Sequence, residues 1–300
     1  QYRGKAVSRW REDPLSDRWG AYCYIRDVNS DRVWSPSFQP CQTIPEEERV
    51  QFSHDKAVFF RKEQTIETEL EICVSPEYDA DVRCITVTNR GAESKVLELT
   101  TFVELSLANP IADEAHPAFS KLFIKTEYDE QTKCLVAGRR ARTVEEEPIW
   151  AAHSLFEEGT LTGSDEFETD RAQFIGRGFS LANPKGIRSR LRGSVGSVSD
   201  PVFVMKRRFS INPDEKKRFF IITAASESKE QVIRTVQDLA PGHSIERTFQ
   251  MAWNRGQIEL HHLHLSEREA IGFQTLASQV LYTPPLRPWR EVSIRENVKG

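Results

Sequence analysis

Alternation of apolar and polar residues with a period of two, from about Tyr22 to Ala225, constrains the fold of this 300-residue chain more than any other feature. In segments 65–74 and 95–107, leucine, isoleucine and valine occupy one face and mainly polar residues the other. This pattern is typical of antiparallel strands with one face in water. About a dozen such runs predict a mainly β fold, a large antiparallel two-sheet sandwich rather than a small immunoglobulin-type one.

Beyond the strands the period changes to 3.6, and three helices are expected, at about 228–239, 244–263 and 266–282. The first and third open with the capping-box pattern, a serine followed three residues later by glutamine or glutamate. We therefore predict a β domain over 1–242 and a helical linker over 243–300. Because two apolar-striped helices lack a helical partner, we expect them to pack on the sandwich and lead into a further domain.

Charge and cysteine content exclude several classes of function. The net charge of −4 is small and its signs are interspersed, so we expect no nucleic-acid partner. The cysteines are odd in number and form no CxxC pair: Cys23, Cys41, Cys73, Cys84 and Cys134. We expect them to be reduced and buried, which predicts a cytoplasmic location. Because the chain begins with Gln1 and not methionine, we expect it to be a segment of a longer protein.

The stretch from Arg9 to Ser35 concentrates three tryptophans and five arginines among several acidic residues. Indole rings stack on the apolar face of a pyranose, and planar guanidinium and carboxylate groups bind its hydroxyls in pairs. The candidate saccharide-binding residues in this stretch are Trp10, Arg11 and Trp19. The alternative is a hairpin whose aromatic side chains enter the core and whose charges face water, and composition alone favours that alternative.

A second candidate segment, 167–178, carries Asp170, Arg171 and Arg177 among glycines. It is too polar for a strand, so we expect a loop whose glycines allow the backbone to approach a ligand closely. Such a loop would offer arginines to a sugar or a phosphate at the rim of a site. The alternative, of equal weight, is a surface loop held by an ion pair of Arg171 with Asp170 or Glu168.

No local motif identifies a catalytic, cofactor or metal site. His116 lies near acidic residues, but such a histidine more often orders a turn than acts as a general base. His261, His262 and His264 lack thiolate or carboxylate neighbours at a spacing that completes a tetrahedral metal site. GxSxG, P-loop and HExxH motifs are absent from the sequence. We therefore predict no catalytic residue, no metal and no cofactor.

Several long segments, in fixed order, resemble the β-supersandwich region of glycoside hydrolase family 94. Besides residues 9–35, they are SPEYDADVRCITVTNRG, NPIADEAHPAFSKLF, FETDRAQFIGRG, SVGSVSDPVFVMKRR and LASQVLYTP. The family contains cellobiose phosphorylase and the cyclic β-1,2-glucan synthases. The motifs most resemble NdvB-like synthases and related β-1,2-oligoglucan phosphorylases, over residues 4–287.

The resemblance implies a galactose mutarotase-like supersandwich, a helical linker, an (α/α)6 barrel and a small C-terminal β domain. In this family the catalytic acid lies in the barrel, which would follow the end of this chain. The resemblance thus implies an accessory carbohydrate-binding or structural domain that packs on the barrel and shapes its substrate cleft, without catalysing alone. Asp170, Arg171 and Arg177 would reach the rim of that cleft, with Trp10 and Arg11 behind them.

The implied partners are a β-glucan or oligosaccharide, the catalytic barrel of the parent chain, inorganic phosphate in the parent and a second copy in a homodimer. A synthase parent would be an inner-membrane protein with this region on its cytoplasmic side. Two alternatives stay open. One is a free-standing glucan-binding module, and the other is a complete glycosidase whose two carboxylates lie far apart in sequence.

Overall fold

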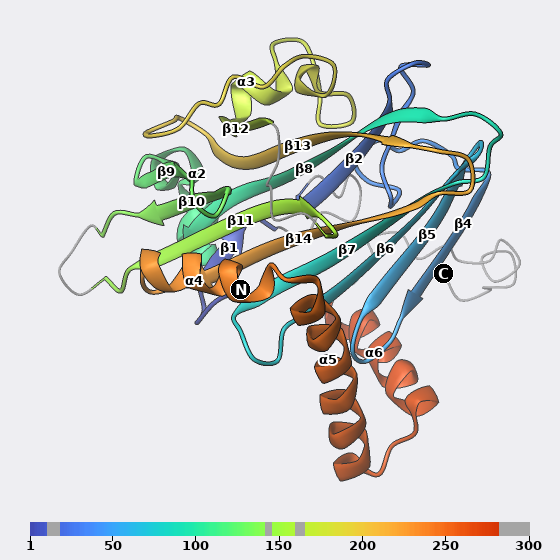
Figure 1. The fold of residues 1–300 in the computed structure, drawn as a ribbon. Coiled ribbons are helices and arrows are strands. Elements are labelled where there is room, and N and C mark those ends of the chain that lie inside the picture. Colours follow the sequence, from blue (N-terminus) through green and yellow to red (C-terminus); the bar gives the residue numbers. More distant parts are fainter. Residues whose placement is uncertain (11–18, 142–145, 160–165, 282–300) are drawn as a thin grey trace, which may run out of the picture.

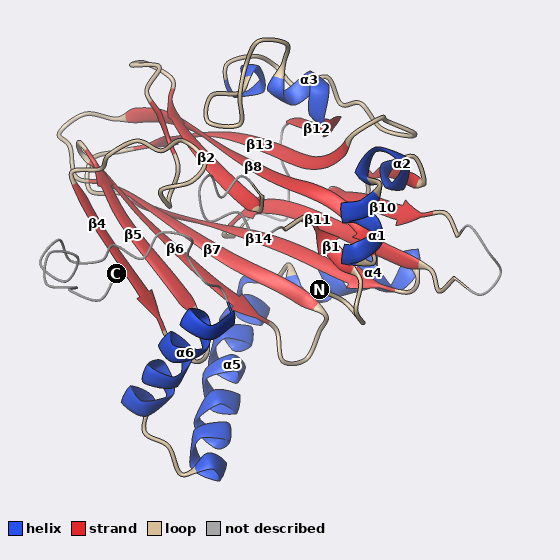
Figure 2. Cartoon of the chain, turned by 180° about the vertical axis from the view of Figure 1, so that it is seen from behind, coloured by secondary structure: helices blue, strands red, loops and turns tan. Residues whose placement is uncertain are grey.

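Two antiparallel β-sheets face each other in the computed structural model, which describes residues 1–10, 19–141, 146–159 and 166–281 (Figures 1 and 2). One sheet has the strand order β12-β13-β8-β2-β3, and β1 pairs with β8. The other has the order β4-β5-β6-β7-β14-β11-β10-β9. The prediction of a mainly β, antiparallel two-sheet fold followed by helices is confirmed.

The chain passes between the two sheets several times. The six-stranded sheet comprises β1 (Ala6–Ser8), β2 (Ala21–Asp27), β3 (Val33–Trp34), β8 (Lys95–Ala108), β12 (Glu166–Asp170) and β13 (Pro201–Ile211). The eight-stranded sheet comprises β4 (Glu47–Phe52), β5 (Ala57–Glu63), β6 (Ile66–Val74), β7 (Ala80–Asn89), β9 (Ile124–Asp129), β10 (Cys134–Arg139), β11 (Ile149–Glu157) and β14 (Lys216–Ser226).

Helices occupy three places along the described chain: the turn after β8, the connection between β12 and β13, and the end that follows β14. In chain order they are α1 (Pro110–Ala115), α2 (Pro117–Lys121), α3 (Arg171–Ile175), the 3-10 helix η1 (Lys185–Ile187), α4 (Lys229–Leu239), α5 (Gly242–Leu263) and α6 (Glu267–Leu281).

The main core lies between the sheets, where the alternating apolar residues meet. Leu70 of β6 and Leu97 and Leu99 of β8 are almost fully buried there. Each such side chain contributes about 1.5–3 kcal/mol by burial. The alternation predicts one wet face for β8, but both faces are covered. The outer face lies under the connection between β12 and β13, whose Phe174 packs on Phe102 of β8 (Figure 1).

Helix α4 covers part of the outer face of the eight-stranded sheet. Its predicted stripe of Val232, Val236 and Leu239 is buried in a second apolar cluster with residues of that sheet. The expected serine cap is present, because Ser228 Oγ accepts a hydrogen bond from the Gln231 backbone N–H at 3.1 Å. The stripe and the cap together explain why the chain turns helical here.

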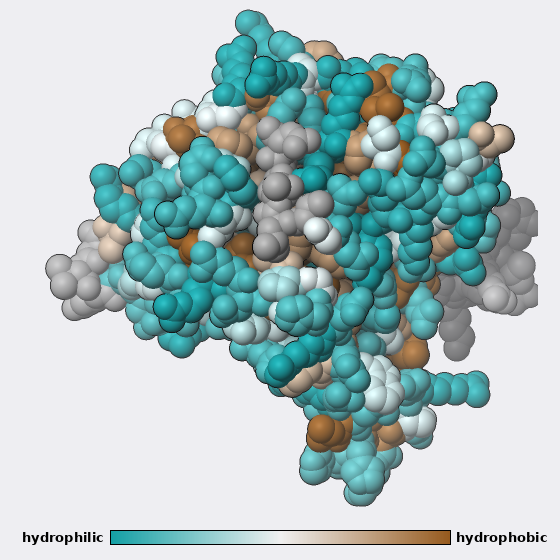
Figure 3. Space-filling model, viewed as in Figure 1, coloured by the Kyte–Doolittle hydropathy of each residue, from teal (hydrophilic) through white to brown (hydrophobic). Residues whose placement is uncertain are grey.

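Helices α5 and α6 form a hairpin that projects from the sandwich (Figures 1 and 2). One side of α5 is buried, through Ile245, Ala252 and Leu260 among others. Helix α6 buries no residue, although it carries several apolar side chains. The capping box of α6 is complete, because Ser266 and Glu269 exchange hydrogen bonds. The surface is mainly hydrophilic, with hydrophobic patches on the hairpin (Figure 3). The division into domains at residue 242 stays a prediction.

Segment 166–175 corrects the prediction of a loop. Its first half is strand β12, which pairs with β13, and its second half is helix α3. The polar residue Glu168 is buried in this strand because its Oε1 accepts hydrogen bonds from the backbone N–H groups of Thr169 and Asp170. The prediction of a loop, which was based on polarity, was therefore wrong, because the backbone of the segment itself satisfies the buried Glu168 carboxylate.

The five cysteines are free thiols, as predicted, and all except the half-buried Cys41 are buried. Burial raises the pKa of the Cys73 thiol to about 12, so this side chain stays protonated and behaves as a small apolar group. None of the helices in the described ranges is sufficiently long and apolar to span a lipid bilayer.

Candidate functional site

A network of charged residues lies around the end of β8, where two of the predicted site segments meet. Arg9 follows β1, and its backbone N–H donates to the Glu104 carbonyl of β8 at 3.0 Å. The Arg9 guanidinium donates from Nε and Nη2 to the two carboxylate oxygens of Asp113 in α1, each at 2.7 Å. This paired geometry is the strongest form of arginine–carboxylate contact.

Glu104 connects this pair to the predicted segment 167–178. Arg171 Nε lies 2.5 Å from Glu104 Oε1, and Arg9 Nη1 lies 3.7 Å from Glu104 Oε2. Arg171 Nη1 also lies 3.9 Å from Asp200 Oδ2. We refer to Arg9, Glu104, Asp113, Arg171 and Asp200 as the arginine network. It ties β1, β8, α1 and the start of α3 into one unit.

The arginine network is largely shielded from water. The side chains of Arg9 and Glu104 are 2% and 3% exposed. Burial works against the charged form of Arg9, but the hydrogen bonds and charge of Asp113, with the charge of Glu104, outweigh it and raise the Arg9 pKa. Arg9 is therefore a fixed cation within the network.

The three tryptophans of the Arg9–Ser35 stretch have three different environments. Trp34 is buried in the main core, as the alternative interpretation of the stretch predicts. Arg9 Cζ lies 5.8 Å from the Trp19 ring centroid, so Trp19 packs on the arginine network. Trp10, next to Arg9 in the chain, is 54% exposed. Arg11 lies outside the described residues.

Asp170 and Arg177 differ in their surroundings. Asp170 caps α3, since its Oδ1 accepts from the Ala172 backbone N–H at 2.9 Å. Arg171 pairs with Glu104 and Asp200 and not with the local acids that the surface-loop interpretation names. Arg177 is exposed between two glycines with positive φ and makes no ion pair with the described residues. Its guanidinium is thus available to a partner in solution.

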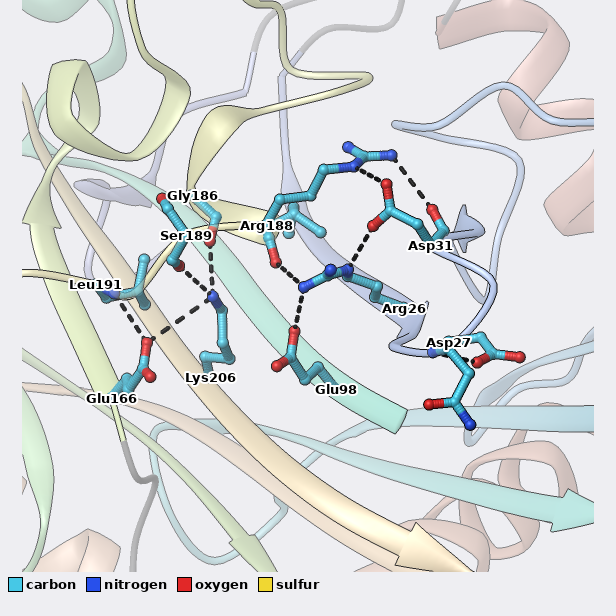
Figure 4. Close-up of polar contacts among 12 residues, drawn as sticks. Arg26, Asp27, Asp31, Glu98, Glu166, Gly186, Arg188, Ser189, Leu191 and Lys206 are labelled. Carbon is cyan, nitrogen blue, oxygen red and sulfur yellow. Dashed lines mark hydrogen bonds and ion pairs between the residues drawn. The ribbon is translucent and has the colours of Figure 1, made fainter. Parts of the chain in front are cut away.

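The connection between β12 and β13, residues 171–200, is held on the outer face of the six-stranded sheet by buried polar contacts (Figure 4). Lys206 Nζ donates to the carbonyls of Gly186 and Ser189 at 2.7 Å each. Burial lowers the pKa of this lysine, and its carbonyl partners compensate for the lost water. Nearby, Asp31 bridges Arg26 and Arg188. These contacts fix the base of the connection and leave Arg177 outside them.

The histidines have structural positions. His116 ends α1 and precedes α2, and its side chain makes no hydrogen bond that caps α2, so its role in ordering a turn stays a prediction. His264 is the left-handed cap that ends α5, with a φ of 54°. Within the described ranges, no three histidine, cysteine or acidic side chains are grouped so that they could hold a metal ion.

Sequence reasoning found Arg171 and Trp19 but missed three partners that organise them: Arg9, Glu104 and Asp113. Their contacts join positions far apart in the chain, so no local motif contains them. One signal was available, because Glu104 is a charged residue inside the long apolar run of β8. A carboxylate in such a run must be paired, and an arginine is its usual partner.

The protein-family match and several similar known proteins indicate the same family. A profile of the glycosyl hydrolase 94 supersandwich domain matches residues 1–241. The chain is 29% identical to the cyclic β-(1,2)-glucan synthase NdvB of Rhizobium meliloti (strain 1021), over 94% of this chain and 10% of the synthase. It is 23% identical to the N,N'-diacetylchitobiose phosphorylase of Vibrio proteolyticus, over 78% of this chain and 29% of the phosphorylase. The solabiose phosphorylase of Paenibacillus borealis is also 23% identical, over 74% of this chain and 28% of its own.

Proposed function

Because this chain belongs to the glycosyl hydrolase 94 supersandwich-domain family, we propose that it is the accessory domain of a β-1,2-glucan synthase or related phosphorylase. The domain contacts the saccharide and shapes the substrate cleft, and the chemistry takes place elsewhere in the parent protein. The chain spans 10% of the synthase and 29% of the chitobiose phosphorylase it matches, so most of each relative lies outside the matched region.

One observation carries this proposal: an exposed indole, Trp10, directly follows a buried arginine that is paired with Asp113. The backbone of Arg9 is hydrogen-bonded to β8, and its side chain is bound to Asp113. The chain is therefore fixed at the residue before Trp10, and less conformational freedom is lost when a sugar stacks on the ring. Arg177, which forms no ion pair with the residues that the structure describes, adds a cation that suits a hydroxyl or a phosphate oxygen.

Helices α5 and α6 support a role as the connection to a catalytic barrel. The exposed apolar side chains of the hairpin are Trp253, Ile258 and Leu263 of α5 and Ile271, Phe273, Leu276, Val280 and Leu281 of α6. Exposed apolar groups of this number are typical of a surface that packs on another domain. In the parent protein, the domain would contact the catalytic barrel, bound phosphate and a second copy of the chain. The parent protein would place this domain in the cytoplasm.

The first experiment asks whether the chain is catalytic alone. The 300-residue protein is incubated with β-1,2-glucan and inorganic phosphate, and glucose 1-phosphate is measured. We expect none above the rate of a heat-denatured control. Release of glucose 1-phosphate would overturn the accessory role, and release of reducing sugar without phosphate would instead identify a glycosidase.

The second experiment separates an accessory domain from a free-standing glucan-binding module. Binding of β-1,2-glucooligosaccharides is measured by titration calorimetry for the wild type, for Trp10→Ala and for Trp253→Ala, an exposed tryptophan on α5 that serves as the matched control. For an accessory domain, we expect the wild type to bind the oligosaccharide weakly. Trp10→Ala should remove this binding, and Trp253→Ala should not. Micromolar binding by the chain alone would favour the free-standing module. Loss of binding only in Trp253→Ala contradicts the proposed contact.

A further inference from the structure

A cavity of about 290 Å³ opens between the two sheets, at the end of the sandwich where β7 begins and β14 ends. Its wall includes Tyr2, Val7, Tyr78, Asp81, Arg83 and Thr223. A cavity of this size is at the lower end of those that bind small molecules, and it can hold one six-membered ring. It is separate from the exposed ring of Trp10 that the proposed function uses.

The most unusual group in this cavity is Arg83, a guanidinium on the inner face of β7. Its Nε donates to Asp81 Oδ1 at 2.7 Å, and its Nη1 donates to the Ala21 carbonyl at 3.0 Å. Its Nη2 donates no hydrogen bond within the part of the chain that the structure describes. The side chain is only 16% exposed. A nearly buried donor without a partner, at the wall of a cavity, is suited to a ligand oxygen.

Asp81 supplies the complementary acceptor. Only its Oδ1 accepts from Arg83, and its Oδ2 accepts nothing from the described residues. The two side chains therefore present a free donor and a free acceptor side by side. Adjacent hydroxyls of a sugar are both donors and acceptors, and they match such a pair.

The β14 side of the cavity carries a hydroxyl that is held in place. Thr223 Oγ1 lies 2.9 Å from His153 Nδ1, and His153 Nε2 lies 2.8 Å from Thr101 Oγ1. These contacts cross the interior from one sheet to the other. Next to them is a space of about 10 Å³, on the order of the volume that a single water molecule needs. A polar ligand therefore meets an oriented hydroxyl in addition to the pair at the wall.

Charge and shape select the class of ligand. The charged side chains at the wall are Asp79, Asp81 and Arg83, so their net charge is −1 and an anion is disfavoured. Tyr2 and Tyr78 add aromatic surface, and Val7 adds an apolar contact. Aromatic surface together with paired donors and acceptors is the combination that a neutral sugar ring requires.

We propose that this cavity binds one neutral pyranose unit, with its hydroxyls on Asp81 and Arg83 and its apolar face against the tyrosines. The site lies between the sheets and goes beyond the saccharide contact proposed for Trp10. It gives the domain a second position for a single sugar unit.

The test uses ¹⁵N-labelled protein titrated with D-glucose and, separately, with inorganic phosphate. Glucose is expected to shift the amide signals of Asp81, Arg83 and Thr223 in a saturable way, and phosphate is expected to leave them unchanged. Saturable phosphate shifts at Arg83, or glucose shifts that never saturate, would overturn the proposal. The indole N–H signal of Trp10 is read in the same spectra, so failure of the Trp10 contact and failure of the cavity site are distinguishable.

Two variants locate the binding. Arg83→Met is expected to weaken glucose binding about tenfold, because a charge-assisted hydrogen bond is lost. Ser8→Trp, from the β1 side of the wall, is expected to fill the cavity and abolish binding while the Arg83–Asp81 pair stays intact. If Arg83→Met unfolds, Ser8→Trp decides. Trp253→Ala on α5 is the control, and glucose binding that persists unchanged in a folded Ser8→Trp protein contradicts the site.

Discussion

Strand β8 and helix α6 are similar in length and apolar content, yet their surroundings are opposite. In β8, every residue from Leu97 to Ala108 is buried, between the other sheet on one side and the β12–β13 connection on the other. In α6, no residue is buried. Hydrophobic burial stabilises only the surface that is removed from water, so β8 carries global stability and α6 carries little. An apolar stripe therefore indicates a surface that needs a packing partner. In this structure the stripe of β8 is covered, and the stripe of α6 is not.

Between these extremes lies α5, which is packed on one side only. Gly256 allows this packing, because a Cβ at that position would lie 1.9 Å from His54 Cδ2. In α6, a Cβ at Gly272 would meet nothing within 4 Å. Two glycines in neighbouring helices thus mark the border between the packed and the unpacked parts of the molecule.

The largest expected effect is in the packed part, at the arginine network. Glu104→Ala removes the nearer carboxylate of Arg171 and one of the two carboxylates beside Arg9, while Asp200 and Asp113 remain, so we expect a loss of about 3 kcal/mol in the free energy of unfolding. Urea unfolding measures it. Glu259→Ala breaks an exposed pair on α5 and should cost less than about 0.5 kcal/mol. Equal losses in the two variants would show that the arginine network does not stabilise the sandwich.

A second effect comes from His153, buried between the sheets. Burial, followed by the charge of Arg83, lowers its pKa to about 3, whereas the unfolded chain has an ordinary histidine pKa near 6.5. Below pH 6.5 His153 gains a proton in the unfolded chain, but in the folded chain it does not gain one until about pH 3. The free energy of unfolding therefore decreases as the pH is lowered from 6.5 to 3.

The contribution of His153 to the free energy of unfolding should fall by about 2 kcal/mol between pH 7 and pH 5. His153→Gln removes this titration, and the comparison of its pH dependence with that of the wild type isolates the effect from that of the carboxylates. Parallel curves for the two proteins would mean that His153 is protonated as readily when folded as when unfolded.

A smaller effect on stability is expected at Gly256, where the packed side of α5 meets His54. Gly256→Ala introduces a clash with His54, and overpacking of this kind typically costs about 1–3 kcal/mol, partly offset by the better helix propensity of alanine. We expect α5 to pack less firmly, seen as faster amide hydrogen exchange in 245–260. The double variant with His54→Ala should restore slow exchange, and failure to do so would exclude the clash as the cause.

The smallest effect is expected in α6. Gly272→Ala adds a Cβ in open space and should favour the helix by about 1 kcal/mol. Because α6 is not packed, the change should increase helical circular dichroism without moving the urea midpoint of the sandwich. A raised midpoint would show that α6 unfolds together with the sheets.

Periodicity predicted most of the strands and the three C-terminal helices, since burial of one face depends on residues that are close in sequence. It did not identify the short strands β1 and β3 or the exposed strand β4. It failed at β12 and α3, because Glu168 and Asp170 are satisfied by backbone N–H groups that only the folded chain presents. Of the predicted site, Arg171 and Trp19 join the arginine network, and Asp170 is a helix cap. The pairing of Arg171 with Glu104 joins residues 67 positions apart, which no local pattern contains.

Strand β4 has a consequence for the behaviour of the protein at high concentration. It forms one edge of the eight-stranded sheet, and all six of its residues are exposed. Glu47, Glu48 and Arg49 place charges on one half of this edge, which opposes the addition of a foreign strand. The other half, from Val50 to Phe52, has no charge and two large apolar side chains. Self-association by strand addition would therefore begin at these three residues, and a lysine at Gln51 would be the mildest way to prevent it.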